Sequence, residues 1–190
     1  MANDDLKNKL IGYIEDAYAM ENEIAEVLEK QVQVTQDVPT INQRLKQHLA
    51  ETQLQRRRMQ HRLEAYGKQP SAIKGAVSNV MGNLVGLTGG LRNDTYSRLM
   101  RDDYTTEHME IAAYTLLITT AELVGDHETV KAAQESLREE IAMAEWCAAH
   151  LPESFLLDLK DQGISAPAGA TQSGPKLTVT FEPSIGQTTK

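Results

Sequence analysis

The sequence predicts an all-α protein built from four long helices, and three observations support this fold class. Four long segments of the 190-residue chain are rich in helix-forming residues and poor in proline and glycine. Short breaks separate the first segment from the second and the third from the fourth, whereas a long glycine-rich connection separates the second from the third. Strand-like alternation is convincing only near the C-terminus, in KLTVTF. We therefore expect two helical hairpins joined by one long connection.

The first two helices are bounded by recognisable breakers. The first is expected over about residues 4–34, which contain no proline and a single glycine. It is followed by TQDVPT, in which Asp37 and Pro39 suit the start of the next helix. The second helix is expected over about residues 40–66 and stops at Gly67. The short break between these helices predicts an antiparallel hairpin.

The second hairpin follows a long connection, residues 68–94, whose segment AIKGAVSNVMGNLVGLTGGL we interpret as a short apolar helix. The third helix is expected over about residues 94–124 and ends at a tight turn that begins with Gly125. The fourth is expected over about residues 127–150, stopped by Pro152, after which PESFLLDLK adds a short terminal helix. A four-helix bundle with one long crossover between its second and third helices has the connectivity of a ferritin-like fold.

Composition divides the chain into two regions and excludes several functions. Residues 1–163 form the predicted bundle, and residues 164–190, rich in Gly, Ser, Thr, Pro and Ala, form a predicted flexible tail. The net charge of -8 argues against nucleic acid as a partner, because phosphate recognition needs a basic surface. The single cysteine, Cys147, excludes an internal disulfide and a thiolate zinc cluster. Arg56, Arg57 and Arg58 are expected to form a solvated helix face.

Hydropathy argues against a membrane location. No apolar run approaches the roughly 18 residues of a membrane span. The N-terminal sequence MANDDLKNKL lacks the apolar segment of a signal peptide. We therefore expect a cytoplasmic protein.

Each predicted helix brings a carboxylate toward the bundle axis. Heptad counting places on this inward seam Leu10, Ile14, Ala17, Glu21, Ile24 and Leu28; Ile41, Leu45, His48, Thr52, Gln55 and Met59; Leu99, Asp103, Thr106, Glu110, Ala113 and Leu117; and Val130, Ala133, Leu137, Glu140 and Ala144. Glu51 borders the second seam, and Glu107 lies one turn before Glu110. Glu21 and Glu51 are 30 residues apart, as are Glu110 and Glu140. The matched spacing predicts four acids at one level of the bundle.

Buried acids that lie this close together need protons or cations. Like charges a few ångströms apart in a low dielectric repel by several kcal/mol, and desolvation adds to the cost. Two divalent cations bridged by carboxylates would solve this problem, and hard oxygen ligands with one imidazole, His48, suit iron or manganese. A single glutamate on a seam can instead reach solvent, and His48 can instead be a core histidine. The interpretation therefore depends on all four acids together.

The motifs around these residues resemble the YciF-like branch of the ferritin-like superfamily. HLAET (48–52), EHMEIAAY (107–114), LREEIAMAE (137–145) and the helix ending AYGKQP carry the resemblance, which spans about residues 5–150. It implies a four-helix bundle with a rubrerythrin-like dinuclear metal site, a dimer and an association with bacterial stress responses. By position, the implied metal ligands are Glu21, His48, Glu51, Glu107, Glu110 and Glu140. Gln55 and Tyr114 are candidate hydrogen-bond partners of these carboxylates, with simple polar packing in the core as the equal alternative.

One departure from the superfamily pattern leaves two functions open. Di-iron bundles place a histidine three residues after the glutamate of the second and fourth helices, but here those positions hold Leu54 and Met143. One hypothesis is an iron or manganese protein that reacts with dioxygen or peroxide as an oxidase, peroxidase or ferroxidase. The alternative is a non-enzymatic stress or scaffold protein with a vestigial metal site. The four matched carboxylates favour the first hypothesis, and the missing imidazoles favour the second.

The connection and the tail suggest two further partners. Uncharged residues of the connection, Val80, Met81, Leu84, Val85 and Leu87, would expose apolar surface on a monomer, so we expect a homodimer. GPKLTVTF in the tail loosely resembles the cargo peptides that dock ferritin-like enzymes into encapsulin shells, but the match is short and does not lie at the C-terminus, which argues against this partner.

Overall fold

The protein is a bundle of long α-helices, and its computed structural model describes residues 2–69 and 95–167. These residues form α1 (Ala2–Val34), α2 (Pro39–Ala65), α4 (Thr95–Val124) and α5 (His127–Asp161), with no strand among them. The all-α prediction is confirmed, and the bounds of the first three helices agree with the predicted ones to within about two residues. In the described residues, no helix combines the length and the apolar character needed to cross a membrane.

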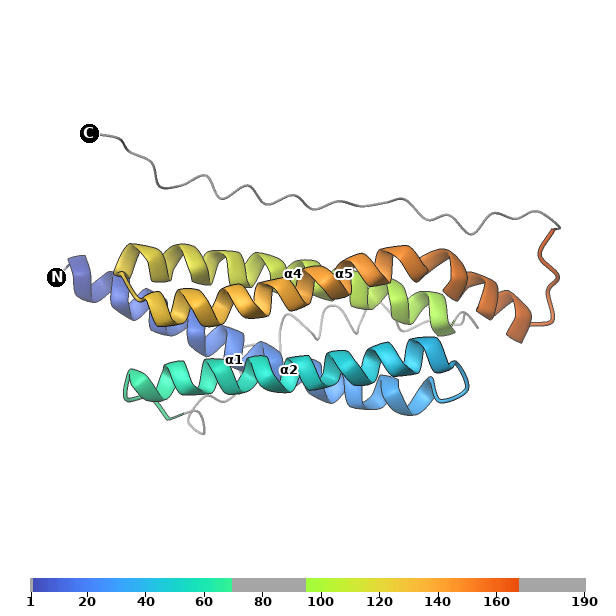
Figure 1. Ribbon diagram of the computed structural model, residues 1–190, viewed down its shortest axis with the longest axis horizontal. Coiled ribbons are helices and arrows are strands. Elements are labelled where there is room, and N and C mark those ends of the chain that lie inside the picture. The colour runs from blue at the N-terminus through green and yellow to red at the C-terminus, as the bar shows by residue number, and fades with distance from the viewer. Residues whose placement is uncertain (1, 70–94, 168–190) are drawn as a thin grey trace, which may run out of the picture.

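The four helices lie side by side along the long axis and form two antiparallel hairpins, α1–α2 and α4–α5 (Figure 1). α2 and α4 run in the same direction, so the end of α2 and the start of α4 lie at opposite ends of the bundle. The predicted crossover helix, the proposed dimer face and the tail segment GPKLTVTF lie outside the described residues.

Short polar networks close the ends of the hairpins. In the α1–α2 turn, the Asn42 amide donates to the Val32 carbonyl (2.7 Å) and to the Thr35 hydroxyl (3.1 Å). α2 ends as predicted, because Gly67 adopts φ of 70° and the Lys68 N–H bonds back to the Leu63 carbonyl. These bonds satisfy backbone groups that a helix end leaves unpaired.

Asp126, in the turn between α4 and α5, joins the two hairpins at the end of the bundle where α2 ends. Its carboxylate caps α5 by accepting from the Thr129 N–H, and it accepts two bonds of 3.0 Å from the Arg62 guanidinium and one of 2.6 Å from the Tyr66 hydroxyl. A single carboxylate therefore serves as a helix cap and as the link between α2 and α5.

The fourth helix is longer than predicted, and the separate terminal helix is wrong. α5 passes through Pro152 and includes PESFLLDLK before it ends at Asp161. Proline lacks one N–H and disfavours the helix interior, but tertiary contacts of the following turns oppose this cost. Asp158 is buried and accepts from the backbone N–H groups of Tyr96 and Ser97, both at 2.8 Å, which caps the first turn of α4.

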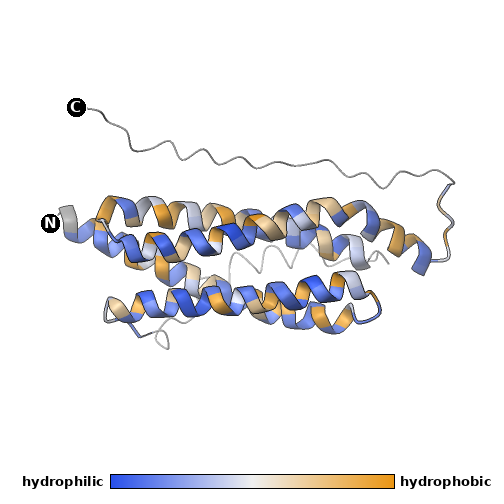
Figure 2. Cartoon of the chain, viewed as in Figure 1, coloured by the Kyte–Doolittle hydropathy of each residue, from blue (hydrophilic) through white to orange (hydrophobic). Residues whose placement is uncertain are grey.

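The core follows the predicted seams. Every seam position of α1 and α2 is buried, while Ala113, Val130 and Leu137 in the second hairpin are only partly buried. Hydrophobic residues recur along each helix among hydrophilic ones, as expected of helices with one face in a core (Figure 2). Acids are buried on the same seams, which is where the candidate site lies.

Candidate metal centre

Four buried side chains converge between α2, α4 and α5. His48, Glu107, Glu110 and Glu140 each offer one ligand atom, and these atoms all lie within 4.8 Å of one another. Glu107 and Glu110 are three residues apart, so α4 presents both on one face. His48 Nε2 lies 3.2 Å from Glu107 Oε1 and 3.8 Å from Glu140 Oε2. We call these four residues the metal centre, because such a donor set could hold a metal ion.

Glu21 is the acid that α1 brings to the core, and it lies beside the four-residue group without belonging to it. Its side chain is fully buried, and its Oε1 accepts a hydrogen bond from the Tyr114 hydroxyl. Its Oε2 has no hydrogen-bond partner. The Glu21 charge acts on Glu110 and Glu140, which places it in the same electrostatic cluster.

Glu51 is at the rim of the centre and not inside it. Its side chain is 19% exposed, and its carboxylate contacts Arg44, Gln47 and His48. Of the six residues predicted as ligands, the fold thus brings His48, Glu107, Glu110 and Glu140 together. Glu21 lies next to them, and Glu51 lies behind His48 on the solvent side.

Several buried donor atoms of the centre have no hydrogen-bond partner in the described protein. They are both oxygens of Glu110, Oε2 of Glu107, Oε2 of Glu140 and Nε2 of His48, whose contact with Glu107 is close but not aligned as a hydrogen bond. An unsatisfied buried polar group costs about 1–3 kcal/mol, and more if it is charged. Oxygens that face one another without donors are what a cation would satisfy, so the donor set fits a metal ion.

The electrostatics of the cluster show how strongly the acids resist ionisation. Burial raises the pKa of Glu110 well above its usual value, and the charges of Glu140 and Glu21 raise it further. Burial and the neighbouring Glu107 likewise raise the pKa of Glu140 well above its usual value. Burial raises the pKa of Glu21 to about 8, although the Tyr114 hydrogen bond opposes the shift. Without a cation, burial and mutual repulsion therefore favour the protonated forms of Glu110 and Glu140, and a bound cation would replace the carboxyl protons between the facing oxygens.

The pKa of His48 is raised and the pKa of Glu51 is lowered, because the two side chains form an ion pair. Burial opposes the charged imidazole, but Glu107 and Glu51 outweigh it and raise the pKa of His48 well above its usual value. Burial would raise the pKa of Glu51, but His48 and Arg44 outweigh it and lower that pKa to about 2. The charged imidazolium form of His48 is therefore favoured beside Glu107 and Glu51 in the metal-free protein.

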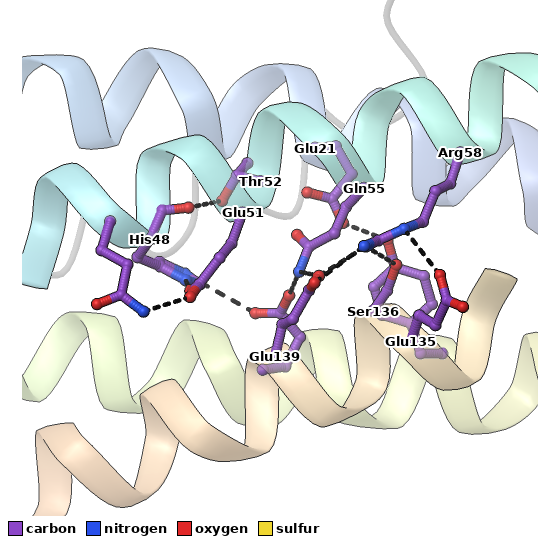
Figure 3. A network of polar contacts seen from close by, with 12 residues as sticks. Glu21, His48, Glu51, Thr52, Gln55, Arg58, Glu135, Ser136 and Glu139 are labelled. Carbon is purple, nitrogen blue, oxygen red and sulfur yellow. Dashed lines mark hydrogen bonds and ion pairs between the residues drawn. The ribbon is translucent and has the colours of Figure 1, made fainter.

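The expected partners of the carboxylates are confirmed, and they extend the network toward solvent. Gln55 donates to Glu140 and, at 2.9 Å, to Glu139 (Figure 3). Arg58 forms a bidentate ion pair with Glu139, with Nη1 2.6 Å from Oε2 and Nη2 2.9 Å from Oε1. Arg58 is thus not part of a freely solvated face as predicted, because Glu139 of α5 lies opposite it.

Sequence reasoning placed Asp103 on the seam but did not assign it to the site. Asp103 is buried one turn before Glu107, where burial raises its pKa to about 7. Gln31 donates to its Oδ1 at 2.6 Å, and its Oδ2 has no hydrogen-bond partner. Its position four residues before Glu107 was the signal that could have identified it.

The chain matches a known family over most of its length. Residues 5–160 match a family described as a domain of unknown function, DUF892. Because the match covers most of the chain, the protein belongs to this family.

Solved structures with similar folds cover most of this chain. A protein from Xanthomonas campestris pv. campestris is 26% identical with a TM-score of 0.67, and the match covers 84% of this chain and 99% of that one. YcfI from Rhodopseudomonas palustris, described as a candidate structural protein, is 26% identical with a TM-score of 0.63, covering 75% and 92%. The E. coli stress protein YciF is 22% identical with a TM-score of 0.62, covering 82% and 97%. The YciF-like resemblance predicted this fold similarity.

Proposed function

We propose that this protein is a ferritin-like metalloprotein that binds a dinuclear iron or manganese centre between its helices and acts in a stress response. The observation that carries the proposal is the convergence of His48, Glu107, Glu110 and Glu140 within 4.8 Å in the core, with acid oxygens that have no hydrogen-bond partner. Apolar residues would fill a core at lower cost, so a ligand is the physical reason for such a group.

The ferritin-like assignment is supported by the helix directions. Two antiparallel hairpins with α2 parallel to α4 are the arrangement that a single long crossover produces (Figure 1). The stress-response assignment draws on the sequence motifs and on the fold shared with the E. coli stress protein YciF. We further propose that the protein is cytoplasmic and that it forms a homodimer. Light scattering of the purified protein tests the dimer directly.

In this proposal the residues of the core have distinct roles. Glu107, Glu110 and Glu140 supply the oxygen ligands, and His48 supplies the imidazole. Glu21 and Glu51 complete the set needed for a second ion. When bound, the metal ions would react with dioxygen or peroxide and change oxidation state. Tyr114 and Gln55 orient Glu21 and Glu140 through their hydrogen bonds.

A non-enzymatic stress or scaffold protein is the second candidate, and a specific observation favours it. The centre has one imidazole, and Glu51 is engaged by Arg44, Gln47 and His48. Such a site could bind metal without turnover. Absorbance changes after addition of ferrous iron and oxygen, or of peroxide, would separate oxidation from binding alone.

The binding proposal is tested by metal content. Protein purified without metal and reloaded with Mn²⁺ or Fe²⁺ should hold about two ions per chain by elemental analysis. Glu110→Gln should lower this number, and Glu122→Gln, which changes an exposed acid on the same helix, should not. Unchanged metal content in Glu110→Gln, together with a destabilised metal-free form, would contradict the proposal, because that result describes a buried salt bridge.

A further inference from the structure

We propose that Arg44 is a positioning residue that competes with the metal ion for Glu51. In the metal-free protein the Arg44 guanidinium holds the Glu51 carboxylate at the rim of the metal centre. Glu51 becomes a metal ligand only when this contact is given up. The inference rests on the proposed metal-binding function, and it adds a residue that sets how tightly the metal is held.

The first argument is that the protein already occupies both oxygens of Glu51. Glu51 Oε2 lies 3.0 Å from Arg44 Nη1 and 3.2 Å from His48 Nδ1, and Oε1 accepts from the Gln47 amide at 2.8 Å. Figure 3 shows Glu51 and His48 extending together from α2. The other nitrogen of His48 faces Glu107, so Glu51 is one imidazole away from the buried acids. Glu51 would have to leave Arg44 and change its side-chain conformation to join the centre.

The second argument concerns the charge of Arg44. Its side chain is only 10% exposed, so its guanidinium is poorly screened by water. Arginine stays protonated under all conditions in which proteins fold, so its positive charge cannot be lost to make room for a metal ion. A divalent ion that binds Glu51 would therefore have to compete with the permanent positive charge of Arg44, which contacts the same carboxylate.

The two arguments give Arg44 opposite effects on the two states of the protein. Without metal, the guanidinium balances one of the excess acids and so favours the folded chain. When a metal ion is present, the same positive charge repels the ion and holds Glu51, one of its ligands, away from it. Arg44 thus lowers metal affinity while it stabilises the metal-free form, and a residue with a purely structural role would not show this pair of effects.

The test measures Mn²⁺ affinity by titration calorimetry, with folding checked by circular dichroism. Arg44→Gln should bind Mn²⁺ about tenfold more tightly than wild type, which corresponds to about 1.4 kcal/mol. Arg44→Lys keeps the positive charge and should stay close to wild type. Glu51→Gln keeps Arg44 but removes the anionic ligand, so it should bind Mn²⁺ less tightly than wild type. If Arg44→Gln does not fold, Glu51→Gln still tests the inference, and wild-type affinity in that variant overturns it.

Two controls separate competition from a general loss of an ion pair. Arg62→Gln removes a comparable ion pair of α2, with Asp126 at 3.0 Å, and should leave the affinity unchanged. Arg62 lies 14 residues from His48, which is roughly 21 Å along the helix. The double variant Arg44→Gln with Glu51→Gln should bind Mn²⁺ no more tightly than Glu51→Gln alone. The gain in affinity from Arg44→Gln disappears because Arg44 acts through Glu51.

The outcomes distinguish this inference from the function on which it rests. If wild type binds Mn²⁺ but Arg44→Gln is folded and binds no more tightly, the competition is refuted and the metal function stands. The same holds if the gain persists in the double variant or appears in Arg62→Gln. If wild type binds none of Mn²⁺, Fe²⁺ or Co²⁺, both the proposed function and this inference are refuted.

Discussion

Replacing Glu21 by glutamine should stabilise the metal-free protein, by an amount that grows with pH. Glu21 is fully buried, and one of its oxygens has no hydrogen-bond partner. Burial is the main reason that its pKa is raised to about 8. Glutamine has nearly the same shape, and its amide oxygen can still accept the hydrogen bond from Tyr114. The substitution therefore removes the acid and leaves the packing in place.

The magnitude follows from the difference between the folded and unfolded pKa of this group. An unfolded glutamate releases its proton near its ordinary pKa of 4.5, whereas the folded one retains it to about pH 8. Over this range the folded state binds more protons than the unfolded state, so the stability of the wild type falls as pH rises. The cost is about 1 kcal/mol near pH 5, about 3 kcal/mol near pH 7 and about 4 kcal/mol near pH 8. Glutamine does not titrate and avoids this cost.

Thermal unfolding in the presence of a chelator would measure the effect. At pH 7 the melting temperature of Glu21→Gln should exceed that of wild type by roughly 10 °C, and the difference should shrink to about a third of this value near pH 5. Glu29→Gln, which changes an exposed acid of the same helix, should behave as wild type. A destabilised Glu21→Gln at pH 7, or a gain that does not depend on pH, would refute the argument that Glu21 is an uncompensated acid.

Two further predictions concern the fold. Asp158→Ala leaves the N–H groups of Tyr96 and Ser97 without their buried acceptor and should lower the free energy of unfolding by about 3 kcal/mol. Asp158→Asn keeps one acceptor oxygen and should lower it by less. An equal loss in both variants would contradict the capping role. Ending the chain after residue 167 should change the melting temperature by only a few degrees, because the predicted tail offers few core-forming side chains. A large drop in melting temperature, measured by thermal unfolding, would mean that the tail packs on the bundle.

The fold could be predicted from the sequence where local signals and tertiary packing agree. Gly67 and Gly125 end helices in the structure as they do in the sequence pattern, and heptad counting identified the buried seams of α1 and α2. Pro152 was misinterpreted because its local preference to end a helix is outweighed by a distant contact. The carboxylate of Asp158 caps α4, and no local pattern around Pro152 reveals that partner.

The candidate site was predictable at the level of helix faces but not of side-chain contacts. Spacing alone indicated that Glu110 and Glu140 face inward, and it placed Glu51 at the border of its seam, where the structure has it. The spacing could not indicate that Arg44, two turns before Glu51, would engage it, since this depends on the conformations of both side chains. The Gln31 partner of Asp103 could not be predicted, because it comes from a helix 72 residues away in sequence.

The most direct test of the metal centre is anomalous X-ray diffraction at the manganese edge from crystals of the Mn²⁺-loaded protein. The account predicts two anomalous peaks in the core, at coordination distance from the carboxylates of Glu110 and Glu140, with His48 ligating one of the ions. Crystals with bound manganese that show no peak beside Glu110, or peaks only on surface acids, would contradict it.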